Sequence, residues 1–157
     1  MHWNYGAYHL RQLSYDSSYF HYQKAHKLFY KTNNLFYAAR MLYNMAFILS
    51  RFRDYTGAEV YLFQAIEIFR PLNKYKQLYQ CYNLLGVVYE ELEDYEKSIS
   101  YHQMALEYLD ELEHKSLFLQ DSYNNMGLIY QKQGNQKTAI AYFEKALKIM
   151  DLRAIDP

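Results

Sequence analysis

At 157 residues, with 51% hydrophobic and 19% aromatic residues, the chain can bury the core of one domain, which excludes a disordered protein. A formal net charge of zero excludes the strong positive field that holds nucleic acid, so we expect no direct nucleic-acid binding. No apolar run approaches the ~20 residues that cross a bilayer, so we expect no membrane span. The single cysteine, Cys81, excludes an internal disulfide and favours the cytoplasm.

Eight helical segments follow one another along the chain. Five glycines and two prolines interrupt a sequence dominated by Leu, Ala, Tyr, Glu, Lys and Gln, which favours an all-α fold. We predict helices over 2–13, 15–31, 35–52, 55–70, 77–92, 95–112, 117–133 and 136–151. The residues that can cap the second helix of each pair are Ser14, Asp54, Asp94 and Asn135. The helices are therefore expected in four pairs.

A repeat with spacings of 40, 40 and 41 residues organises these pairs. It is marked by small residues in the first helix of each pair, Gly6, Ala46, Gly86 and Gly127, and by alanines 19 residues later, Ala25, Ala65, Ala105 and Ala146. Seven residues before each alanine stand Ser18, Ala58, Ser98 and Ala139, and three residues before it stand Tyr22, Leu62, His102 and Phe143. Two helices pack closely only where one surface lacks bulk, so we expect these positions at the helix crossings.

The pattern resembles the tetratricopeptide repeat family. The match is most specific in the last two units, at Tyr82, Leu85, Gly86, Tyr89, Ser98 and Ala105, and at Tyr123, Met126, Gly127, Tyr130, Ala139, Phe143 and Ala146. It is weaker in the first two, where Ala46 replaces Gly and where His9 and Leu49 stand at the usual Tyr position. The units exceed the family's usual length of about 34 residues. They resemble the long repeats of partner-binding scaffolds and of bacterial sensory and regulatory proteins.

This resemblance implies a right-handed α-solenoid of about four antiparallel helix pairs. It implies one domain over 1–157, with repeats near 1–34, 35–76, 77–116 and 117–153. In the family, the first helices line a concave groove that recruits a protein or peptide, without catalysis and without a cofactor. We therefore expect a non-enzymatic interaction or sensor region of a larger signalling protein, either cytoplasmic or an extracytoplasmic fragment of a sensor.

The family's groove positions can be carried onto this sequence. Two residues before each repeat's Gly or Ala stand Asn4, Asn44, Leu84 and Asn125, and one residue earlier stand Asn83 and Asn124 in the last two repeats. Other groove positions are Trp3, Arg40, Tyr43, Phe47, Arg51, Gln80, Val87, Glu90 and Asp121. Asparagine amides can hold the N–H and C=O groups of an extended peptide without reading its sequence. The alternative is that these amides bridge neighbouring helices.

Charge bears on the kind of partner. Basic and acidic groove residues together favour a ligand of mixed charge. Family members that clamp a C-terminal carboxylate need donors where this chain has Gln80, Leu84 and Asp121, so we predict no binding of peptides ending in Glu-Glu-Val-Asp.

Residues 1–78 carry ten Lys/Arg against four Asp/Glu, a charge of +6, and residues 79–157 carry seven against thirteen, a charge of −6. These halves are either differently solvated surfaces, or they orient a charged partner, or they stack head to tail in a self-associating structural segment.

Residue patterns for other chemistry are weak. The six histidines, His2, His9, His21, His26, His102 and His114, include no pair four residues apart, so we expect no metal site. Cys81 has no nearby histidine in sequence and is expected to be a packed thiol. Glycines occur singly, which excludes a phosphate-binding loop.

Overall fold

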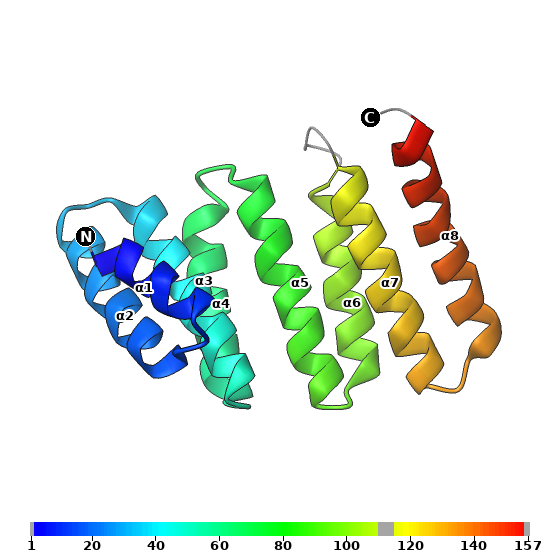
Figure 1. The fold of residues 1–157 in the computed structure, drawn as a ribbon, viewed down its shortest axis with the longest axis horizontal. Coiled ribbons are helices and arrows are strands. Elements are labelled where there is room, and N and C mark those ends of the chain that lie inside the picture. Colours follow the sequence, from blue (N-terminus) through cyan, green and yellow to red (C-terminus); the bar gives the residue numbers. More distant parts are fainter. Residues whose placement is uncertain (1, 110–114, 156–157) are drawn as a thin grey trace. The chain divides into compact units, whose positions relative to one another are not determined.

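The computed structural model describes residues 2–109 and 115–155, and within them the chain is entirely α-helical, without a strand (Figure 1). The eight helices of this described part are α1 (His2–Arg11), α2 (Tyr15–Lys31), α3 (Leu35–Arg51), α4 (Tyr55–Phe69), α5 (Tyr75–Glu91), α6 (Tyr95–Glu107), α7 (Ser116–Lys132) and α8 (Gln136–Ile155). The predicted all-α solenoid class is confirmed. The helix predicted over 95–112 ends earlier, at Glu107, and its residues 110–112 lie outside the described part.

All four predicted cap residues directly precede the second helix of their pair, and three of them make a capping hydrogen bond with the side chain. The side chain of Asp54 accepts a hydrogen bond from the Gly57 backbone N–H at 2.9 Å, and Asp94 accepts one from Lys97 at 3.2 Å. Asn135 accepts one from the Thr138 backbone N–H at 3.2 Å. Ser14 is the N-cap residue of α2, as predicted, but its side chain makes no capping hydrogen bond.

The chain forms two compact units, Met1–Gln77 and Leu78–Pro157. In the first unit, α1 packs on α2, α2 on α3, and α3 on α4. Its core is centred on small and aliphatic side chains that are fully buried, including Ala38, Ala39, Met41, Met45, Ala46, Ile48, Ala58, Leu62 and Ala65. The repeat alanines and their small partners thus lie at the helix crossings, as predicted.

The second unit contains most of α5 together with α6, α7 and α8. Here too the repeat positions are buried, at Ser98, His102, Ala105, Ala139 and Ala146. A Cβ placed on Gly86 would lie 2.6 Å from His102 Nε2, and one on Gly127 would lie 2.5 Å from a carbon of the Phe143 ring. The glycines are therefore required by the close approach of a ring from the next helix. The repeat boundaries inside each unit stay predictions.

Candidate peptide-binding surface

All the predicted groove residues lie on the first helix of a pair. In the first unit, Asn4 and Arg51 are exposed, and Arg40, Tyr43, Asn44 and Phe47 are half-buried. In the second unit, Asp121 is exposed, and Gln80, Asn83, Asn124 and Asn125 are half-buried. Leu84, which interrupts the asparagine series, is buried at 7% exposure.

Helix α3 presents the predicted residues of the first unit on one face. Arg40, Tyr43, Asn44, Phe47 and Arg51 follow one another at steps of one, three or four residues, which places them on one side of a helix. The opposite side of α3 is fully buried in the core of the unit. Because the core takes one side, the predicted residues remain accessible on the other.

Arg40 lies in an aromatic cluster shared by α1 and α3. Its guanidinium carbon is 5.4 Å from the centre of the Trp3 ring, 5.7 Å from that of Tyr37 and 5.9 Å from that of Phe36. The Trp3 and Tyr37 rings are themselves 6.1 Å apart. Among the residues that the structure describes, Arg40 forms no ion pair. Its positive charge is therefore held in place by ring faces and stays open to an acidic group.

Asn83 and Asn125 form a hydrogen-bonded pair in the second unit. Asn125 on α7 donates from Nδ2 to Asn83 Oδ1 on α5 at 3.4 Å, and His102 Nδ1 on α6 lies 3.1 Å from the same oxygen. Since that oxygen can only accept, the His102 Nδ1–H donates to it. For this pair the alternative interpretation holds, in which the amides bridge neighbouring helices: together with His102 they join α5, α6 and α7. By contrast, Asn4, Asn44 and Asn124 make no side-chain hydrogen bond to any described residue.

Within this network, the pKa of His102 is strongly shifted by burial. The residue is 0% exposed, and its Nε2 has no hydrogen-bond partner among the described residues. Burial lowers the pKa of His102 from 6.5 to about 4, because the charged imidazolium would lose its hydration. His102 is therefore neutral at physiological pH, with Nδ1 carrying the proton.

One predicted groove acid is already paired. Glu90 on α5 contacts Lys132 Nζ on α7 at 2.8 Å, with side-chain exposures of 13% and 46%. The hydrogen bond to Glu90 raises the pKa of Lys132. Glu90 is therefore less available to a ligand than its sequence position suggested.

Known proteins share this architecture. The family model described as tetratricopeptide repeat matches residues 37–111 and 77–151. The chain belongs to the tetratricopeptide repeat family. A search of curated proteins finds no match.

Solved structures of similar fold include the BtubC (BKLC) protein from P. vanneervenii, with a TM-score of 0.87 and 23% identity, and the apo form of RapI, with 0.87 and 21%. NprR in complex with its cognate peptide NprX matches with a TM-score of 0.77 and 22% identity. The matches cover 98%, 98% and 94% of this chain but only 63%, 56% and 43% of those chains. The tetratricopeptide repeat chain thus spans less than two thirds of each, and the likeness shows the fold.

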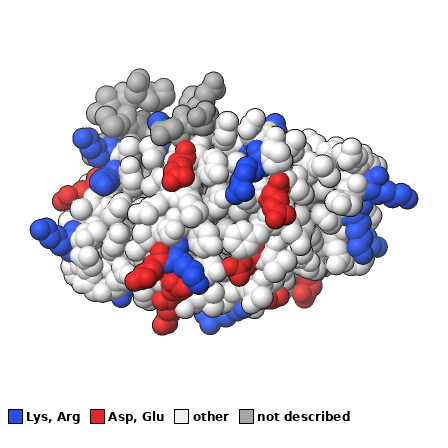
Figure 2. Space-filling view, turned by 180° about the vertical axis from the view of Figure 1, so that it is seen from behind, with Lys and Arg blue, Asp and Glu red and all other residues white. Residues whose placement is uncertain are grey.

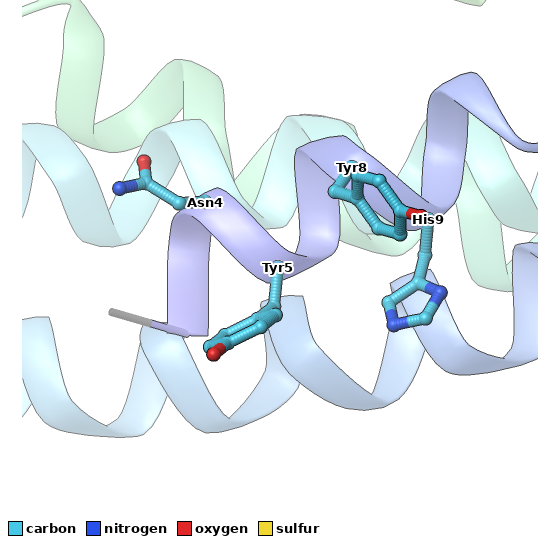
Figure 3. Close-up of a pocket in the computed structure, with 4 residues that line it drawn as sticks. All are labelled: Asn4, Tyr5, Tyr8 and His9. Atoms are coloured by element: carbon cyan, nitrogen blue, oxygen red, sulfur yellow. The ribbon is translucent and has the colours of Figure 1, made fainter.

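A pocket opens on α1 and includes one of the predicted residues. Its lining residues are Asn4, Tyr5, Tyr8 and His9. Figure 3 shows the rings of Tyr5 and His9 extending from one side of α1, while Asn4 points away from them. The sequence interpretation missed these rings, because it treated the first repeat as a weak copy of the others.

The described residues show neither a patch of one charge on the face in Figure 2 nor a cluster of metal ligands. Figure 2 shows basic and acidic side chains interspersed on one face and separated by uncharged surface. No group of three His, Cys, Asp or Glu side chains within the described part could hold a metal ion. No helix in the same part is long and apolar enough to cross a membrane. Cys81 is buried as predicted, and burial raises the pKa of its thiol, which keeps it unreactive.

The structure also joins histidines that the sequence interpretation left scattered. His2 and His9 on α1 both stack with His21 on α2, with ring centres 5.4 Å apart in each case. The signal that could have revealed this cluster is the repeat itself, since the three residues occupy repeat positions held by tyrosines in the last two units.

Proposed function

We propose that this tetratricopeptide repeat chain binds an extended peptide or protein segment through the accessible face of its first helices, as the interaction region of a larger signalling protein. The observation that carries the proposal is the Asn83–Asn125 pair. Their mutual hydrogen bond orients both amides and leaves Asn83 Nδ2 and Asn125 Oδ1 without a partner among the described residues. One donor and one acceptor on neighbouring helices match the C=O and N–H groups of an extended backbone.

Two similar structures support this function. The NprR structure contains its cognate peptide NprX, and a Rap protein structure, with a TM-score of 0.81 and 22% identity, contains the Competence and Sporulation Factor. Both are complexes of a longer chain, 42% and 43% of which has a fold of this kind.

Arg40 favours a ligand that carries an acidic group. Its guanidinium rests on ring faces and lacks an ion pair within the described residues, so an acidic group of the ligand can complete its hydrogen bonding. For the first unit we therefore infer a ligand segment with at least one carboxylate, which lies opposite Arg40.

The experiment is to titrate the isotope-labelled chain with a pool of synthetic random octapeptides and to follow backbone amide shifts. We expect perturbations on α3 and α7. Asn44→Ala and Asn125→Ala should each weaken the best peptide roughly 2- to 12-fold, which corresponds to the usual 0.5–1.5 kcal/mol of one hydrogen bond. Helix content should stay unchanged, because neither amide is part of the apolar core.

Matched controls are available on the second helices. Gln64 on α4 and Gln103 on α6 are exposed amides away from the predicted positions, and their replacement by alanine should leave the affinity unchanged. Equal losses from both sets of variants would contradict the proposal. An absence of perturbation on α3 and α7, together with sedimentation that depends on concentration, would favour the structural, self-associating segment instead.

A further inference from the structure

Three imidazoles meet between α1 and α2, and we call His2, His9 and His21 the histidine cluster. The His21 ring is parallel to that of His9 within 4° and to that of His2 within 29°, and both ring centres lie 5.4 Å away. His2 Nδ1 and His21 Nδ1 are 3.1 Å apart, a hydrogen-bond distance. One of these two nitrogens must carry a proton and the other must not.

The histidine cluster occupies positions that hold tyrosines elsewhere in the chain. These positions lie four residues before and three residues after the repeat's small residue, and four residues before its alanine. The third repeat has Tyr82, Tyr89 and Tyr101 there, and the fourth has Tyr123, Tyr130 and Tyr142. The tyrosine rings contact one another in the same arrangement, with ring centres between 5.2 and 6.4 Å apart, and three of the four pairs are stacked while Tyr123 and Tyr142 are tilted by 46°. Stacking between the two helices therefore does not require histidine.

Histidine differs from tyrosine at these positions in its charge. Unperturbed imidazoles titrate near 6.5 and phenols near 10, so of these three stacks only the one in the first repeat can gain charge in mildly acidic solution. The first proton taken up by His2 and His21 can be shared in their hydrogen bond. A second proton places two N–H donors against each other at that distance, and the bond is lost.

The surroundings of His21 oppose its protonation. Partial burial, His2, His9 and then Lys24 all lower the pKa of His21. Tyr5 on α1 also stacks on the His21 ring at 5.4 Å. Among the described residues, no carboxylate acts on His21, and from α3, the other helix packed on α2, the charge of Arg40 acts on Tyr22 instead. A positive charge on His21 therefore faces other cations and aromatic rings but no described acidic group.

We propose that the histidine cluster is a pH-sensitive contact that releases α1 from α2 in mildly acidic solution. Helix α1 has only 10 residues, too few to remain helical in water without packing, so loss of the contact unfolds it. The released form binds more protons than the docked form, and release is favoured as the pH falls below 6.5. The proposal does not depend on peptide binding.

Trp3, the single tryptophan of the chain, reports on α1 directly. The test is to follow its fluorescence and acrylamide quenching between pH 7.5 and 5. We expect a red shift and greater quenching, with the docked-to-released ratio falling at least about fivefold between pH 7 and 5.5. The matched control is the chain's own tyrosine stack, introduced as His2→Tyr, His9→Tyr and His21→Tyr, which should remove the transition.

A second variant covers the case in which the triple variant folds poorly. His21→Tyr alone removes the central imidazole and should reduce the pH response of Trp3 by more than half, while His26→Gln on the same helix should not alter it. The proposal is overturned if wild-type Trp3 shows no transition above pH 5, or if the tyrosine variants keep it unchanged.

Discussion

The two units build the same helix crossing with different rings. In the first unit, Ser18 Oγ donates to the Gly6 carbonyl at 2.8 Å, and in the second, Ser98 Oγ donates to the Gly86 carbonyl at 2.7 Å. The ring packed against the glycine is Tyr22 in the first unit and His102 in the second. Burial raises the pKa of Tyr22 further above neutrality, whereas it lowers that of His102. The crossing accepts any ring of suitable size, but the ring chosen decides how the unit responds to acid.

The largest effect that separates the units should come from His102. Below pH 6.5 the unfolded chain binds a proton at His102 that the folded chain does not bind until about pH 4. The free energy of unfolding should therefore fall as the pH decreases from 6.5 to about 4. The lowering of the pKa corresponds to about 3 kcal/mol. Urea unfolding at pH 7, 5.5 and 4.5 would measure it.

The control for this effect is His102→Phe, since Phe143 fills the equivalent position against Gly127. The variant should lose the acid sensitivity that His102 contributes. Parallel losses of stability in wild type and variant between pH 6.5 and 4 would show that His102 is not responsible.

A smaller effect should follow from Gly86→Ala. The added Cβ would meet the His102 ring at 2.6 Å, and such overpacking typically costs about 1–3 kcal/mol. The second repeat has Ala46 and Leu62 at these two positions, both 0% exposed. Adding His102→Leu to Gly86→Ala should therefore recover part of the loss in thermal unfolding. Stabilisation by Gly86→Ala alone, as helix propensity would give, would contradict this account.

The smallest effect concerns the turns within the helix pairs. Leu13, Arg53 and Glu93 adopt positive φ values of 56°, 62° and 60°, and the fourth repeat has Gly134 at 77° in the same place. A side chain in this conformation costs about 1 kcal/mol, so Glu93→Gly should stabilise the chain by up to that amount and Gly134→Ala should destabilise it similarly. Urea midpoints of both variants check the opposite signs, and Glu93→Ala separates the backbone effect from the lost charge.

Much of the fold could be predicted because its signals are local. The small residues at Gly6, Ala46, Gly86 and Gly127 identified the helix crossings, and Asp54, Asp94 and Asn135 identified helix starts. Ser14 also identified a helix start, but its side chain makes no capping hydrogen bond, since a hydroxyl caps only when its rotamer points at the free N–H groups, which the residue type alone does not determine.

For the candidate site, the sequence predicted only which residues lie on the same face of a helix. Sequence by itself determined which residues share the accessible side of α3, because helical periodicity depends on spacing alone. Only the tertiary structure decided that Asn125 bonds Asn83, that Glu90 is neutralised by Lys132, and that His2, His9 and His21 stack. Each of these contacts joins different helices, and hydrogen bonds and ring stacking depend on separations of a few tenths of an ångström that helix packing sets and spacing along the chain does not.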